Sequence, residues 1–140
     1  MSTTGLEAFD TTLQKTQAWL KEVMVELEWE DRHKAYLALR TVLHALRDRL
    51  TVEEAVQLGA QLPMLIRGFY YDGWKPTGKP VKERHQFFTQ IAHAFSNDLS
   101  VVPHTIAHAV FTVLAQHISE GEIADIKQML PADIRDLWPS

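Results

Sequence analysis

Cysteine is absent from the 140-residue sequence. Its absence excludes disulfide bonds, thiolate metal sites and cysteine nucleophiles, and it fits a reducing compartment, so we expect a cytoplasmic protein. An excess of basic residues is also lacking, because the net charge is −4 and the isoelectric point is near 5.9. Nucleic-acid binding requires a clear basic footprint, and we therefore expect no nucleic-acid partner.

Long apolar runs and glycine-rich motifs are missing as well. No uncharged apolar run approaches the ~18 residues that a membrane-spanning helix needs, so we expect no membrane partner. The first residues carry neither the basic nor the apolar region of a signal peptide. The sequence contains no Gly-x-Gly-x-x-Gly and no Gly-x-Ser-x-Gly motif, and we expect neither a catalytic role nor a cofactor.

Hydrophobic residues make up 46% of the sequence and charged residues of both signs 23%, which is typical of a soluble globular protein. The length fits a single domain, residues 1–140. Apolar residues recur at steps of three and four, which predicts an all-α fold of about eight helices with no strand. The predicted helices cover residues 5–28, 31–49, 51–62, 63–70, 82–95, 103–117, 119–130 and 131–138.

Apolar stripes define the faces of these helices. Thr4 and Glu7 have the spacing of a capping box, which would start the first helix. That helix carries one long stripe, interrupted by Thr16 and formed by Leu6, Phe9, Leu13, Leu20, Val23 and Leu27. The second stripe is formed by Tyr36, Leu39, Leu43, Leu46 and Leu50. In the helix at 82–95 we expect the core residues to be Phe88, Ile91 and Phe95, with Phe87 beside them.

Four short segments occur twice, in the same order, in the two halves of the sequence. Thr41-Val42-Leu43 recurs as Thr112-Val113-Leu114, Thr51…Glu54 as Ser119…Glu122, Leu62-Pro63 as Leu130-Pro131, and Ile66-Arg67 as Ile134-Arg135. Matching caps, prolines and stripes indicate an internal duplication. We predict two tandem related four-helix units, about residues 5–70 and 82–138, joined by a linker at 71–81. Each unit alone has a marginal core, so the two should pack on each other.

The same features resemble a known family. The stretch Leu39-Arg40-Thr41-Val42-Leu43-His44-Ala45-Leu46, the box from Thr51 to Glu54 and the segment Gln61-Leu62-Pro63 are similar to the bacterial family catalogued as domain of unknown function 2267. The resemblance covers nearly the whole chain and implies an all-helical, cytoplasmic bacterial protein with two related halves. It implies no activity. The second half departs from the pattern with Met129 at the position equivalent to Gln61.

His104 and His108 are the candidate metal ligands. Residues four apart lie on one helix face, which is a metal-ligand spacing. The Glu that follows the first His of the zinc-protease motif is missing, and a site needs further ligands that the sequence does not place. Surface or helix-capping histidines are the alternative.

Arg67 and Arg135 occupy equivalent positions in the two predicted units. Each can pair with a carboxylate such as Glu54 or Glu122, or bind helix-end carbonyls. Anion binding is the functional alternative for both arginines.

Tyr71 and Trp74 are the candidate binding residues of the linker. We expect both to follow the end of the helix at 63–70, where large apolar rings need a partner. That partner can be the second unit, another subunit or a ligand. The linker region also carries a basic cluster, which we interpret as solvated surface: Lys75, Lys79, Lys82 and Arg84.

These patterns favour one function over another without naming a partner. The sequence predicts a non-catalytic, soluble helical module for protein–protein interaction, whose partner is itself or another protein. The alternative is a small-ligand or metal-binding protein that uses the helix-end histidines or the groove between the two units.

Overall fold

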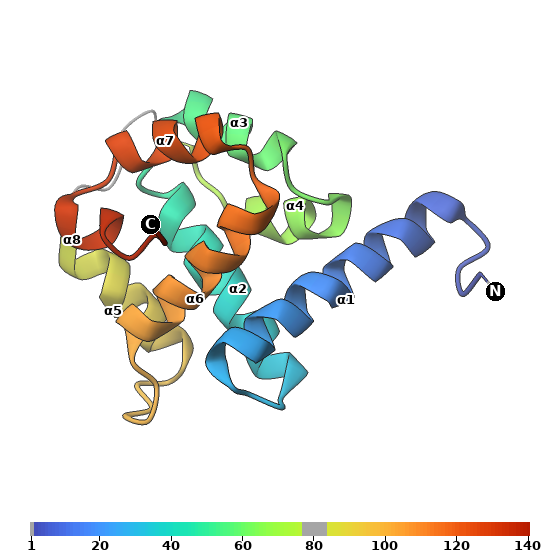
Figure 1. Ribbon diagram of the computed structural model, residues 1–140, viewed down its shortest axis with the longest axis horizontal. Helices are drawn as coiled ribbons and strands as arrows, with labels where there is room; N and C mark the ends of the chain where they lie inside the picture. Colours follow the sequence, from blue (N-terminus) through green and yellow to red (C-terminus); the bar gives the residue numbers. More distant parts are fainter. Residues whose placement is uncertain (1, 77–83) are drawn as a thin grey trace.

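The computed structural model describes residues 2–76 and 84–140, and every regular element in these ranges is an α-helix (Figure 1). In chain order the helices are α1 (Glu7–Leu27), α2 (Arg32–Arg47), α3 (Val52–Ala60), α4 (Met64–Tyr71), α5 (Arg84–Ala94), α6 (Pro103–His117), α7 (Glu120–Gln128) and α8 (Ala132–Arg135). The predicted all-α fold is confirmed, since none of the described segments forms a strand. The helix bounds follow the predicted ones closely. The last helix ends at Arg135, earlier than the predicted residue 138.

Helices α2 and α6 form the centre of the fold, and α1 and α5 pack against both of them (Figure 1). The predicted stripe of α2 is buried, because Leu39, Leu43 and Leu46 have no exposed surface. Ala35 and Ala38 are equally buried. Small side chains at these positions let neighbouring helices approach α2 closely.

Phe87, rather than Phe88, is the fully buried aromatic residue of α5. The Phe87 ring lies against Phe111, with ring centroids 6.2 Å apart. Phe88 is half-buried. The expectation that Phe88 is a core residue and Phe87 its neighbour is therefore wrong, because Phe87 and Ile91 are four residues apart and share the face toward α2 and α6.

Polar caps and prolines set the starts of the shorter helices. The Thr51 hydroxyl accepts a hydrogen bond from the Glu54 N–H before α3, and the Ser119 hydroxyl accepts one from the Glu122 N–H before α7. Pro63 precedes α4 and Pro131 precedes α8. These predicted helix starts are confirmed.

The predicted cap of α1 by Thr4 is wrong. Leu6 holds the N-cap position and makes no side-chain bond. The Thr4 N–H and hydroxyl instead donate to Asp10 Oδ1 at 3.0 and 2.8 Å, while the Ser2 hydroxyl donates to the other carboxylate oxygen. The hydrogen bonds from Ser2 and Thr4 hold the pKa of Asp10 below its usual range. The segment before α1 therefore folds back onto the first turn of that helix.

Helices α3 and α7 lie side by side, although they come from opposite halves of the chain (Figure 1). Gln61, at the C-terminal end of α3, joins them. Its Nε2 donates to Ser119 Oγ at 3.1 Å, and its Oε1 accepts from the Ser119 N–H at 2.9 Å. Met129 holds the corresponding place after α7 and has no amide to make such bonds. The division into two tandem units and the single domain stay predictions.

The linker predicted at 71–81 lies partly outside the described residues. Lys79 and Lys82 of the basic cluster lie wholly outside them. A membrane-spanning helix is not found in the ranges 2–76 and 84–140, where each helix is too short or too polar to cross a bilayer.

Candidate functional site

The N-terminal half of α1 reaches past the body of the molecule (Figure 1). Its C-terminal half packs on α6, where the rings of Trp19 and His117 stack with centroids 4.4 Å apart. The stripe predicted for α1 is therefore divided. Leu20 and Val23 are buried, but the first three members are not: Leu6 is 54% exposed, Phe9 48% and Leu13 37%.

Thr12 holds the first half of α1 against the start of α4. Pro63 precedes α4 without providing a side-chain cap, and the first N–H groups of a helix have no partner within it. The Leu65 N–H donates to Thr12 Oγ1 at 2.9 Å. This bond turns the Thr12 side of α1 toward α4 and buries it. The adjacent α4 side chains point outward, with Met64 47% and Leu65 41% exposed.

Four exposed apolar side chains lie next to one another here: Phe9, Leu13, Met64 and Leu65. Leu6 is exposed on the same side of α1 as Phe9 and Leu13. We name the surface of these five side chains the α1–α4 face. A shallow hollow with an almost wholly apolar lining lies on this face, bordered by Phe9, Leu13, Met64, Leu65 and Gly68 together with Thr4 and Thr12. Gly68 keeps the hollow open, because no atom lies within 4 Å of the place that its Cβ would take. An apolar side chain from another molecule can enter such a hollow.

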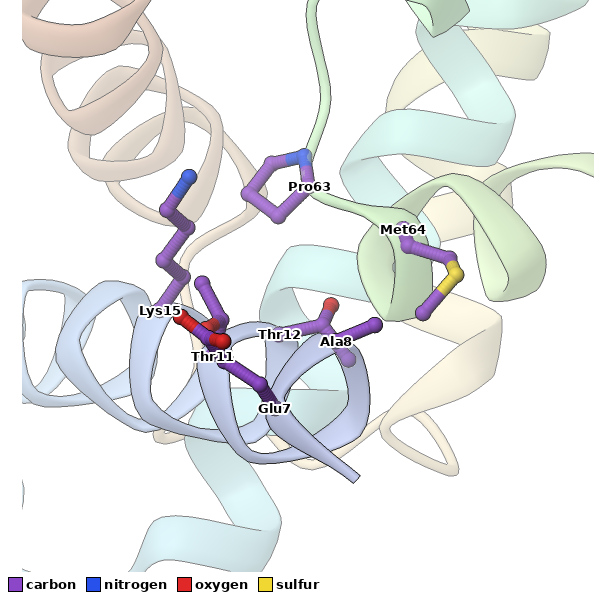
Figure 2. A pocket seen from close by; sticks show the side chains of 7 residues that line it. All are labelled: Glu7, Ala8, Thr11, Thr12, Lys15, Pro63 and Met64. Atoms are coloured by element: carbon purple, nitrogen blue, oxygen red, sulfur yellow. The ribbon is translucent and has the colours of Figure 1, made fainter.

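A second groove, of about 490 Å³, lies where α1 passes the start of α4. Figure 2 shows Pro63 and Met64 facing the side of α1 that carries Ala8, Thr12 and Lys15. Its lining mixes charged, hydroxyl and apolar side chains. Thr12 and Met64 border both the groove and the apolar hollow, so the two depressions adjoin each other.

Residues 16–137 match the family described as an uncharacterized conserved protein, DUF2267. The chain belongs to this family. The match confirms the resemblance noted in the sequence, and a comparison with curated proteins found no match. In this DUF2267 protein, Met64 and Leu65 of the α1–α4 face lie inside the matched range, whereas Leu6, Phe9 and Leu13 precede it.

Tyr71 and Trp74 of the DUF2267 protein are half-buried and pack against its core. Tyr71 is the last residue of α4, so the expectation that it follows the end of this helix is wrong. Trp74 does follow the helix. The two rings stack on each other with centroids 5.5 Å apart. Packing within the chain accounts for the buried part of both rings, and a binding role for them stays a prediction.

Gly59 of α3 makes room for Tyr71. A Cβ on Gly59 would lie 2.3 Å from the Tyr71 hydroxyl oxygen and 2.7 Å from the adjoining ring carbon. We expect Gly59→Ala to lower the free energy of unfolding by about 1–3 kcal/mol in urea denaturation, because a rigid ring must move.

Gly121→Ala is the matched control for this substitution. Gly121 lies in α7, and a Cβ there would meet no atom within 4 Å. Alanine should therefore be neutral or stabilise the DUF2267 protein by up to about 1 kcal/mol. Equal losses in the two variants would contradict the role given to Gly59.

Arg67 binds helix-end carbonyls, which was one of the alternatives for it. Its Nε donates to Gly59 O at 2.8 Å, and its Nη2 donates to Leu62 O at 2.8 Å. These carbonyls lie at and after the end of α3, where a helix cannot satisfy its own acceptors. Arg67 is half-buried, whereas Arg135 is exposed at the end of α8. The equivalence of the two arginines in sequence does not extend to their surroundings.

His104 and His108 are both exposed on α6, and each contacts a different group. The His104 ring stacks on Phe88 with centroids 3.8 Å apart. His108 Nδ1 lies 2.7 Å from Leu137 O, which it can approach only as a donor. Within the part of the chain that the structure describes, neither belongs to a group of three metal-ligand side chains. These contacts tie α6 to α5 and to the segment after α8.

Met64, Leu65 and Gly68 were not expected as site residues from the sequence. Leu20 follows Leu13 by seven residues, lies on the same side of α1, and is buried. The exposure of Leu6, Phe9 and Leu13 therefore follows from the reach of α1 past the other helices, which its hydrophobic pattern does not record.

Proposed function

We propose that the protein is a non-catalytic helical interaction module that pairs with a second copy of itself through the α1–α4 face. The observation that carries this proposal is the exposure of five large apolar side chains on one surface. Each is about half exposed, so together they present on the order of 400 Å² of apolar surface. Single apolar residues are ordinary on protein surfaces, whereas an apolar patch of a few hundred Å² is often functional.

The size of the face suits a dimer. A standard interface buries about 800 Å² on each partner, and about 65% of a homodimer interface is apolar. The α1–α4 face therefore supplies most of the apolar area that one partner needs. Tyr36 and Phe69 border an adjoining hollow that shares Leu13 and Leu65 with the face, and they extend its apolar surface.

The shape of the face suits a second copy of the same chain. Phe9 and Leu13 of α1 form an exposed apolar ridge, and the hollow beside Met64, Leu65 and Gly68 has almost no polar lining. In a twofold pair the same patch is used by both subunits, so the ridge of each copy can enter the hollow of the other. A partner of different sequence would instead leave the pure protein monomeric.

The molar mass in solution, measured by sedimentation equilibrium, tests this proposal. The wild-type protein should approach twice the 16.0 kDa of one chain at micromolar concentrations. Leu13→Asp should be monomeric, because pairing would bury an unpaired charge in an apolar interface. Gly68→Leu should also weaken pairing, since it fills the hollow without adding a charge.

Leu99→Asp is the matched control. Leu99 is 98% exposed and lies between α5 and α6, away from the α1–α4 face. The same change of side chain there should leave pairing intact. A wild-type mass of one chain at every concentration, or equal loss of pairing in Leu99→Asp, would contradict the proposal.

We also propose that the chain arose by internal duplication and works in the bacterial cytoplasm. The duplication is supported by the matching caps Thr51 and Ser119 and by Pro63 and Pro131 before α4 and α8. The cytoplasmic location is supported by the lack of cysteine.

A further inference from the structure

Two buried carboxyl groups meet where α3 and α7 lie side by side. Glu54 is in the first turn of α3 and Glu122 in the first turn of α7, and they are 5% and 7% exposed. The Oε1 atom of each is buried and accepts no hydrogen bond from the described residues, apart from the contact of the two carboxyl groups with each other. Unpartnered carboxyl oxygens are strongly unfavourable in a protein interior. The pair therefore needs a proton or a cation to be stable.

Gln61 replaces the Glu122 carboxyl as the acceptor at the start of α7. In a complete capping box, the Glu side chain accepts a hydrogen bond from the N–H of the capping residue. At α7 this N–H belongs to Ser119, and it donates to Gln61 Oε1 at 2.9 Å. Glu122 is thus not needed at its own helix end and lies against Glu54.

The charged surroundings of the pair are acidic. Burial, the hydrogen bond with Glu122, and the negative charges of Glu122, Asp125 and Glu53 raise the pKa of Glu54 to about 8. Tyr70 of α4 is another ionisable group whose pKa is affected by Glu54 and Glu122. Its hydroxyl donates to a carbonyl oxygen of α3 at 2.7 Å, and its pKa is raised, chiefly by burial. The charges that shift the Glu54 pKa are thus those of other carboxyl groups.

We propose that Glu54, Glu122 and Asp125 form a binding site for one divalent cation of the hard, oxygen-preferring class, such as Ca²⁺ or Mn²⁺. Each of the three contributes a carboxylate oxygen, and these oxygens lie within 4.8 Å of one another. Oxygen ligands lie about 2.3–2.6 Å from Ca²⁺, so two oxygens on opposite sides of the ion are about 5 Å apart. Three oxygens with this spacing can therefore share one ion.

The position of Asp125 makes the site accessible. Asp125 is exposed, whereas Glu54 and Glu122 are buried. The ion can enter from the Asp125 side and keep water ligands there, as hard divalent cations commonly do. This site does not use the α1–α4 face, so its failure or success is separate from that of the proposed pairing.

The test titrates Ca²⁺ and, separately, Mn²⁺ into the metal-free full chain, purified without an affinity tag, with calorimetric detection. We expect one ion per chain. Glu54→Gln should abolish binding, because it removes a buried ligand charge. Asp125→Asn should weaken binding by about tenfold or more.

Glu53→Gln is the matched control, since Glu53 is the exposed neighbour of Glu54 on α3, and it should bind like the wild type. Asp125 is also exposed, so Asp125→Asn remains decisive if Glu54→Gln fails to fold. The absence of saturable binding of either ion to the wild-type protein would overturn the proposal. Unchanged affinity in Asp125→Asn would do so too, and so would equal losses in Glu53→Gln, which would show attraction to acidic surface alone.

Discussion

Replacing Arg47 by alanine should lower the free energy of unfolding by about 3 kcal/mol. Arg47 of α2 is 5% exposed. Its Nη1 donates to Tyr70 O at 2.7 Å and to Asp72 O at 3.2 Å. These carbonyls end α4, where a helix lacks donors of its own and favours a positive charge. In the alanine variant, the carbonyl oxygens of Tyr70 and Asp72 would lose their charged hydrogen-bond donor.

Arg40→Ala is the control for this substitution. Arg40 also belongs to α2 and pairs with Asp72 at 3.0 Å, but the two side chains are 36% and 68% exposed. An ion pair with that exposure is worth only about 0–1 kcal/mol. Urea denaturation of both variants measures the contrast. An equal loss of unfolding free energy in the two variants would show that neither burial nor the bonds to the α4 carbonyls explains the contribution of Arg47 to stability.

The wild-type protein should lose stability as the pH rises from about 5 to about 8 in the absence of divalent cations. Burial, and then the contact with Glu122, raises the pKa of Glu54 from 4.5 to about 8. The folded chain therefore keeps a proton at pH values where the unfolded chain has released it. The resulting stability is complete below about pH 4.5 and is lost as the pH rises through about 8, with a total loss on the order of 5 kcal/mol.

Glu54→Gln isolates this effect, because glutamine is neutral throughout the range. The variant should exceed the wild type in stability at pH 8, and the difference should shrink toward pH 5. His44 acts in the opposite direction, since burial and the charges of Arg47 and Arg40 lower its pKa. It is present in both proteins and cancels in the difference. Parallel pH profiles of unfolding would rule out the carboxyl pair as the cause.

The sequence predicted those parts of the fold that depend on local chemistry. Thr51 and Ser119 satisfy N–H groups within their own helices, and Pro63 and Pro131 restrict the backbone before α4 and α8. The face of α1 depends on a distant contact instead. Thr12 binds the Leu65 N–H, 53 residues away. Hydrophobic periodicity records that Leu6, Phe9 and Leu13 are apolar, but not that α1 extends past the helices that would cover them.

The two candidate sites were hidden for a related reason. Glu54 and Glu122 read as capping residues in the sequence, and only the packing of α3 on α7 brings their carboxyl groups together. Their equivalent positions in the proposed internal repeat were the one available signal. Equivalent residues of two related units face each other when the units pack about a twofold axis, as in a symmetric dimer. Gln61 accepts the hydrogen bond of the Ser119 N–H. The Glu122 carboxyl is therefore not needed as a cap and lies against Glu54.

Pairing of the α1–α4 face with the same face of a second copy is tested most directly by a distance between copies. The chain contains no cysteine, so Gln17→Cys and Gln128→Cys each carry one spin label per copy. Gln17 borders the hollow that adjoins the face, and Gln128 is exposed at the end of α7. Pulsed dipolar spectroscopy should give one defined distance between Gln17 labels, shorter than that between Gln128 labels. No dipolar coupling between Gln17 labels, or a shorter distance between Gln128 labels, would contradict pairing through this face.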